Sequence, residues 1–214
     1  YFRGRFFAVP FLLRRSLQKS SMKAFFSQIA SDFSHWNTKM LCRAGVVAAL
    51  YAVVTWLLGS FAFGPFQIRP AEALTILPLF FPETVPALYI GCLLANIISA
   101  YGVYEILGSL ATLFAAFATY CVGIAFRNHV VRVALGGFFP VIFNAFIVPA
   151  VWLLAGTPDV VYWVSFGEMV LTQSVWIYAL GTPLYFAVHK LRQRGVKVFT
   201  SPVRAQQPNK EQNG

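Results

Sequence analysis

The feature that most constrains this chain is the scarcity of charge between Ala44 and His189, where only eight residues are charged. Apolar stretches of about 20 residues fill this region, which is the length that an α-helix needs to cross a bilayer. The whole chain is 58% hydrophobic and 11% charged, whereas soluble domains are about 25% charged. We therefore predict an all-α integral membrane protein and exclude a soluble domain.

Turn residues and charges divide the apolar region into six segments. The predicted segments are 41–60, 71–82, 85–101, 104–126, 133–155 and 161–188. Segment 71–82 is short for a crossing by itself, but counting it places 16 of the 17 lysines and arginines on one side of the membrane. Cytoplasmic loops are enriched in these residues. We therefore predict a compact bundle of six transmembrane helices with both termini in the cytoplasm, and Arg69 as the one basic residue outside.

The two ends of the chain differ from its middle. Residues 1–40 form a basic extension that lacks a convincing cleavage site, so we predict no signal peptide. Within it, apolar residues recur at helical spacing on one face, which is typical of a helix lying in the membrane interface. They are Met22, Phe25, Phe26, Ile29, Phe33 and Trp36. Residues 41–189 form the membrane domain, and 190–214 form a basic, disordered tail. Since the positive charge is explained by cytoplasmic ends beside anionic lipid, we expect no nucleic-acid partner.

Small residues recur every four positions in the first segment, at Ala44, Ala48 and Ala52. Such a stripe lets another helix approach closely, which matters in lipid because no hydrophobic drive joins helices there. The other helix can belong to a partner protein or to this chain, and the pattern alone leaves both interpretations open.

Several polar side chains fall inside or beside the apolar segments. Ionisable groups at such positions are costly and face a cavity or a partner, which makes Glu72 and Glu168 candidates for a binding site. Glu72 also has a local explanation, because Pro70 fits the first position of a helix and a carboxylate in the first turn complements the helix dipole. The amides that can bind a ligand or join helices are Asn96, Asn144 and Gln173.

Motifs for catalysis are missing from the sequence. It has no G-x-x-x-x-G-K-[ST] phosphate loop and no spacing typical of a catalytic triad or metal site. Its cysteines, Cys42, Cys92 and Cys121, form no C-x-x-C pair and are interpreted as small apolar residues. We expect no enzyme activity, no metal and no cofactor in this chain.

Three stretches resemble the QueT family, whose members are substrate-binding (S) subunits of energy-coupling factor (ECF) transporters. They are "FQIRPAEALTILPLFFPETVPALYIGCLLANIISAYGVYEILGSLATLFAAFATY", "FFPVIFNAFIV" and "SFGEMVLTQSVWIYALGTPL". The resemblance covers about Arg43 to His189. It implies a six-helix subunit of a bacterial cytoplasmic membrane, which captures queuosine precursors (7-deazaguanine bases) at the outer face. It also implies a transmembrane T subunit and two ATPase subunits as partners. The S subunit would topple in the membrane during transport and would contact the T subunit through Ala44, Ala48 and Ala52.

A deazaguanine presents an N–H and an amino group side by side, next to a carbonyl. A carboxylate can accept both donors, and an amide or arginine can bind the carbonyl. We therefore predict a pocket formed by Glu72, Glu168, Asn96, Asn144 and Gln173, with Arg69 and Gln67 on the loop that closes it. The alternatives are an S subunit for a different vitamin or nucleobase-like ligand, and a stand-alone membrane carrier or intramembrane enzyme.

Overall fold

The computed structural model of the chain describes residues 11–63, 68–99, 103–157, 160–196 and 198–199. The chain divides into two compact units, Tyr1–His35 and Trp36–Gly214. In the first unit the described residues form one helix, α1 (Phe11–Ser34), which begins earlier than the predicted interfacial helix. Its place at a membrane interface stays a prediction.

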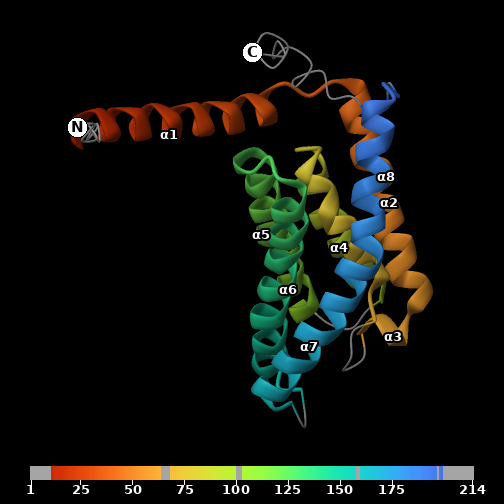
Figure 1. The fold of residues 1–214 in the computed structure, drawn as a ribbon. Helices are drawn as coiled ribbons and strands as arrows, with labels where there is room; N and C mark the ends of the chain where they lie inside the picture. Colours follow the sequence, from red (N-terminus) through yellow and green to blue (C-terminus); the bar gives the residue numbers. More distant parts are fainter. Residues whose placement is uncertain (1–10, 64–67, 100–102, 158–159, 197, 200–214) are drawn as a thin grey trace. The chain divides into compact units, whose positions relative to one another are not determined.

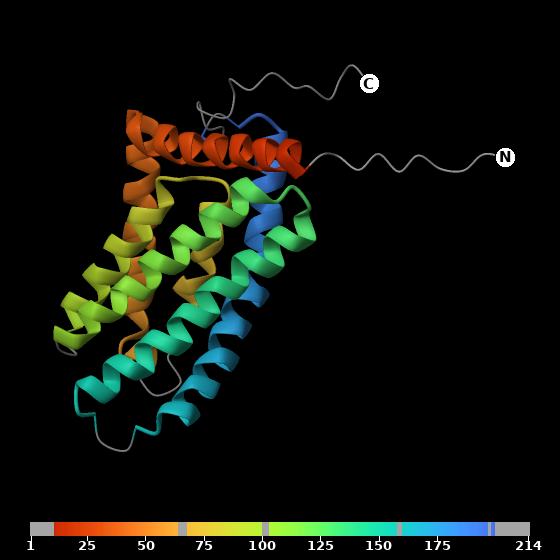
Figure 2. The same ribbon diagram turned by 90° about the vertical axis from the view of Figure 1, so that its left-hand side faces the viewer.

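In the described part of the second unit all regular secondary structure is helical, and no strand is present. In chain order its elements are α2 (Thr38–Leu58), α3 (Ser60–Phe63), the 3₁₀ helix η1 (Pro70–Leu79), α4 (Thr84–Ser99), α5 (Val103–Ala125), α6 (His129–Leu154), α7 (Tyr162–Trp176), the π-helical turn η2 (Ile177–Gly181) and α8 (Thr182–Gln193). Helices α2, α5 and α6 are long and apolar enough to cross a membrane, while η1 and α4 are apolar but shorter. The helices run alongside one another as a bundle (Figures 1 and 2), as a multi-pass membrane protein requires.

Local capping fixes where two of the long helices begin. The Asn37 side chain accepts a hydrogen bond of 2.9 Å from the backbone N–H of Met40, and α2 starts at the next residue after Asn37. Asn128 does the same for Val130, so α6 starts at His129 rather than at the predicted residue 133. An asparagine before the first turn satisfies one of the N–H groups that a helix leaves unpaired.

Element η1 lies in the middle of the second unit, where it packs against α2, α4, α5, α6, α7 and α8. The sequence predicts a short helix here, and the structure shows a 3₁₀ helix that is buried along nearly all of its length. A 3₁₀ helix rises about 2.0 Å per residue instead of 1.5 Å, so ten residues reach about 20 Å. The short segment therefore extends further than an α-helix would, and protein surrounds most of it.

Contact between η1 and α5 depends on a glycine. A Cβ atom on Gly123 would lie 2.7 Å from the Leu79 carbonyl oxygen and 2.8 Å from its Cα. The Arg132 guanidinium donates to the carbonyls of Leu79, at 2.5 Å, and Gly123, at 3.2 Å, and thereby ties the ends of η1 and α5 to α6.

We expect Gly123→Ala to destabilise the protein by about 1–3 kcal/mol, because the new methyl group meets backbone atoms of η1 that cannot rotate away. Thermal unfolding in detergent measures the effect. Gly167→Ala is the matched control, since nothing lies within 4 Å of a Cβ at Gly167. A Gly123→Ala protein that melts like the control would contradict the close packing of η1 on α5.

Helices α7 and α8 follow each other through the π-helical turn η2, so that residues 162–193 form one continuous helical segment (Figure 1). Pro183 explains the turn. Proline has no N–H to donate, and its ring collides with the carbonyl four residues earlier. The wider π turn immediately before it accommodates this defect. Helical structure reaches Gln193, so the tail predicted from residue 190 begins inside this helix, and the part of it beyond residue 199 lies outside the described residues.

The alanine stripe of α2 is buried. Ala44, Ala48 and Ala52 are each at most 8% exposed, and a Cβ on Gly91 of α4 would lie 2.7 Å from the Ala48 carbonyl oxygen. The stripe thus packs within this chain, which is the interpretation that the sequence leaves open beside partner docking. The large apolar side chains that α2 exposes are Leu41, Val46, Leu50, Val53, Trp56 and Leu57.

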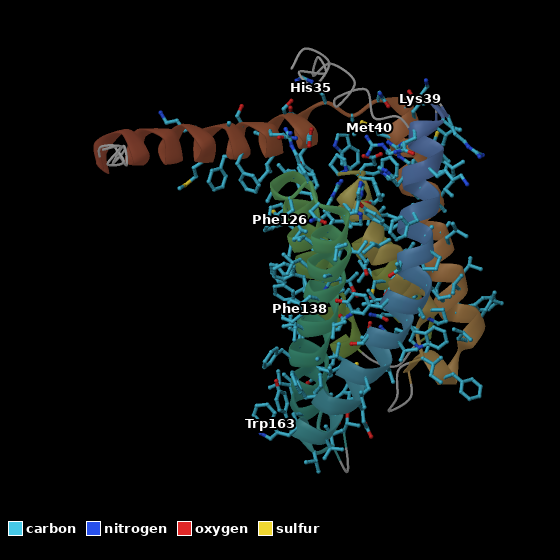
Figure 3. All side chains as sticks on the ribbon, in the orientation of Figure 1. His35, Lys39, Met40, Phe126, Phe138 and Trp163 are labelled. Carbon is cyan, nitrogen blue, oxygen red and sulfur yellow. The ribbon has the colours of Figure 1, made fainter. Side chains whose placement is uncertain are left out.

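The outer surface of the bundle carries large apolar side chains. Phe126, Phe138 and Trp163 point away from α5, α6 and α7 (Figure 3), and Trp163 is 70% exposed. Such residues are unfavourable in water but suit a lipid-facing surface.

Candidate functional site

Glu72 is the central residue of the candidate site. It lies in the first turn of η1 and is 1% exposed. Its Oε1 accepts a hydrogen bond of 2.6 Å from the phenol of Tyr51 on α2, whereas its Oε2 has no partner among the described residues. A carboxylate buried with one oxygen unpaired is unfavourable by itself. A favourable interaction with the helix dipole would not require Glu72 to be so deeply buried, so it does not by itself explain this position.

Two further side chains face the same carboxylate. Arg69, the residue before η1, is buried, and its charge acts on Glu72. Its Nε donates to the Ala62 carbonyl at 2.7 Å, which anchors the start of η1 to α3. The Asn144 side chain of α6 also lies near Glu72. Its amide nitrogen is buried, and within the described part of the chain it has no partner at hydrogen-bond distance and angle.

A row of small polar groups on α4 and α5 continues from this point. Cys92 interacts with Tyr51, Glu72 and Arg69, and its Sγ accepts from the Thr112 hydroxyl at 3.4 Å. One turn further along α4, the Asn96 amide donates to the Ser109 hydroxyl at 2.9 Å.

The arrangement leaves specific atoms for a ligand. Glu72 Oε2 and Gln173 Oε1 are acceptors, and Asn144 Nδ2 is a donor; all three are buried, and none has a partner in the residues that the structure describes. Each unpaired buried group costs about 1–3 kcal/mol. A small molecule with adjacent N–H donors and a carbonyl acceptor would remove this cost at Glu72 and Asn144.

The structure brings some of the predicted site residues together and leaves others apart. Glu72, Arg69 and Asn144 come together directly, and Asn96 is connected to them through Cys92. Gln173 is buried on the face of α7 that also carries Ser165 and Met169. Among the described residues no direct contact joins the Gln173 side chain to Glu72.

Glu168 is the predicted residue with the weakest structural connection to the site. It is half-buried on α7, and no hydrogen bond or ion pair of its side chain occurs among the described residues. The contact at this position is made by its backbone carbonyl, which accepts from the Thr172 hydroxyl at 2.9 Å. Gln67 lies outside the described residues.

Tyr51 is the site residue that the sequence analysis missed. A tyrosine within an apolar segment resembles the many aromatic residues that face lipid. The available signal was its position three residues after Ala48 and one before Ala52, on the same side of the helix as the alanine stripe.

The other buried glutamate, Glu83, also has one carboxylate oxygen without a hydrogen-bond partner among the described residues, but its other oxygen is held by a cation. It is fully buried beside α4 and forms an ion pair with Arg43 of α2, whose guanidinium also lies 4.0 Å from the centre of the Phe81 ring. Glu83 therefore joins two elements of the bundle.

No group of three or more His, Cys, Asp or Glu residues in the described ranges is placed to hold a metal ion.

Comparison with known proteins adds two findings. The family described as QueT transporter matches residues 41–190 of the chain. The protein "Queuosine precursor transporter QueT" of Lactococcus lactis subsp. cremoris (strain MG1363) is 37% identical over 79 residues, which is 36% of this chain and 47% of that protein. The aligned region thus spans about half the length of this relative. No solved structure matches the chain.

Proposed function

The chain belongs to the QueT transporter family, and from this premise we propose that it binds a queuosine precursor, a 7-deazaguanine base, and takes part in its uptake. The relative from Lactococcus lactis is named as a queuosine precursor transporter, which supports the choice of ligand. We propose no catalytic reaction for this chain.

The observation that carries this proposal is the set of unpaired polar atoms around Glu72. In the proposed complex the carboxylate accepts the ring N–H and the amino group of the base, and Asn144 donates to the carbonyl next to them. Arg69 places a positive charge near the carboxylate. Asn96 and Gln173 supply further polar contacts, and Glu168 and Gln67 belong to the proposed pocket on the sequence argument alone.

We further propose six membrane segments with both termini in the cytoplasm. The segments are α2, η1, α4, α5, α6 and the continuous segment of α7, η2 and α8. In this topology Arg69 and the start of η1 lie toward the outer face, and Arg43, Glu83 and Arg132 lie toward the cytoplasm. The excess of lysine and arginine on one side supports this orientation.

The proposed mechanism is that of an S subunit of an ECF importer. The chain captures the base from outside and then topples against a T subunit, while two ATPase subunits hydrolyse ATP. The lack of a phosphate loop in the sequence agrees with hydrolysis in other chains. Docking through Ala44, Ala48 and Ala52 requires α4 to move aside, so we place the T-subunit contact on the exposed α2 side chains Val53, Trp56 and Leu57.

Two alternatives keep part of this proposal. An S subunit of the same architecture can bind a different vitamin or nucleobase-like ligand, and a stand-alone carrier needs no partner subunits. Equilibrium binding against a panel of bases and vitamins distinguishes the first alternative from the proposed ligand. Co-purification of a T subunit and ATPases would exclude the second alternative.

We expect equilibrium binding in detergent to show that a 7-deazaguanine base binds more tightly than unrelated vitamins. The site as described discriminates through the edge that carries the amino group and the carbonyl. An analogue without the amino group should bind about tenfold or more weakly, because one acceptor of Glu72 is left unpaired. Equal affinity for this analogue would argue against the proposed contact.

A further inference from the structure

A groove of about 560 Å³ opens between α2 and α8, away from the cluster around Glu72. Both helices pack on η1, and the lining includes Leu74 and Leu77 of η1 and Phe81, the residue after its C-terminal cap. Val46 and Leu50 of α2 line one side of the groove and Leu184 of α8 lines the other. The volume is within the range of about 300–1,000 Å³ that is typical of small-molecule sites.

The groove has charge at one end only. Its charged lining residues are Lys39 and Arg43, which belong to the first two turns of α2, whereas apolar residues line the rest. The last turn of α8 carries Lys190 and Arg192, which do not themselves line the groove. Figures 1 and 2 show that the start of α2 and the end of α8 lie at the same end of the unit, and Figure 3 labels Lys39 there.

The length of the groove matches one leaflet of a bilayer. From Lys39 to Leu50 an α-helix rises about 17 Å, and half of a hydrocarbon core of about 30 Å is about 15 Å. In the proposed topology the cationic end lies at the cytoplasmic interface, where anionic lipids are concentrated. A groove of this length, with positive charge at the headgroup level and apolar walls beyond it, is complementary to one anionic lipid molecule.

We propose that this groove binds an anionic phospholipid of the inner leaflet, with one acyl chain against Leu74, Leu77 and Val188 and the headgroup beside Lys39. Arg43 strengthens the positive field at the mouth while its guanidinium remains paired with Glu83. The lipid thereby covers the part of η1 that neither α2 nor α8 covers. The base-binding cluster is not involved.

Native mass spectrometry tests this proposal on the full chain extracted from vesicles of equal parts phosphatidylglycerol and phosphatidylcholine. We expect one phosphatidylglycerol to survive a delipidating detergent wash. Val46→Trp, which fills the groove, should lose it, and Val53→Trp should keep it. The two valines are 59% and 49% exposed on the same side of α2, and only Val46 lines the groove, so the pair is matched in size and lipid exposure.

The contribution of the lysine charges is tested with separate variants. An unchanged melting temperature shows that each variant is folded. Lys39→Gln should lower phosphatidylglycerol retention about fivefold, as expected for one lysine near a charged surface, and Lys190→Gln should lower it less. Three results would overturn the proposal: equal retention of phosphatidylcholine, wild-type retention by Val46→Trp, or a groove occupied by a second copy or by a T subunit in place of lipid. None of these readouts requires the base to bind, so failure here is distinguishable from failure of the proposed function.

Discussion

Replacing Glu72 by glutamine should lower the affinity for a 7-deazaguanine base about a hundredfold. The carboxylate offers acceptors to both donors of the base, and each hydrogen bond to a charged group contributes about 1.5–3 kcal/mol. An amide in its place turns one acceptor into an N–H group that faces a donor. A loss of about 3 kcal/mol corresponds to the hundredfold change, and isothermal titration in detergent measures it.

Glutamine should preserve the fold while it weakens binding. It has nearly the size of glutamate and keeps an oxygen for the Tyr51 hydroxyl. Loss of the charge removes the cost of a buried carboxylate but also its attraction to the buried Arg69, so the melting temperature without ligand should change little. Tyr51→Phe should weaken binding to a smaller extent, because the carboxylate stays but loses the phenol that orients it. Wild-type affinity in a folded Glu72→Gln protein would place the binding site elsewhere.

The same substitution at the second predicted glutamate, Glu168→Gln, should have a different effect from Glu72→Gln. Glu168 makes no polar side-chain contact in the described part of the structure, so it should matter only for a base that carries an aminomethyl cation. We expect reduced affinity for that base and unchanged affinity for the base without the aminomethyl group. Equal loss for both would assign Glu168 to recognition of the ring itself.

Much of the fold can be predicted from the sequence because membrane segments are defined by composition over a long window. The ends of α2, α4 and α5 lie within about three residues of the predicted limits. Element η1 could not be predicted as a 3₁₀ helix. Propensity does not distinguish it from an α-helix, and its conformation depends on close packing against neighbours such as Gly123, which is distant in sequence.

The candidate site was predictable only in part, for a similar reason. Glu72 and Asn144 stand out because polar groups are rare in apolar segments. Tyr51 does not stand out among the nine tyrosines and 22 phenylalanines of the chain, and its role depends on which face of α2 turns inward. A stripe of small residues marks a closely packed face without saying whether the neighbouring helix is its own or a partner's.

Replacing Ala48 by tryptophan should prevent a stable fold, because the side of α2 that carries Ala48 packs against α4. At this position the Ala48 carbonyl oxygen would lie 2.7 Å from a Cβ on Gly91, so α2 and α4 meet backbone to backbone. An indole ring cannot fit there unless the helices separate, and this would also withdraw Tyr51 from Glu72. We expect aggregation in detergent, or a melting temperature lowered by many degrees, together with loss of base binding.

Ala49→Trp is the matched control, because Ala49 is the next residue of the same helix and is exposed. It should fold and bind the base like the wild-type protein, so a difference between the two variants reports the α2–α4 contact rather than the cost of a tryptophan in this helix. The opposite pattern has a definite meaning. If Ala48→Trp melts and binds like the wild-type protein but no longer co-purifies with a T subunit, the alanine stripe faces a partner, and the packing of α4 on α2 described here is wrong.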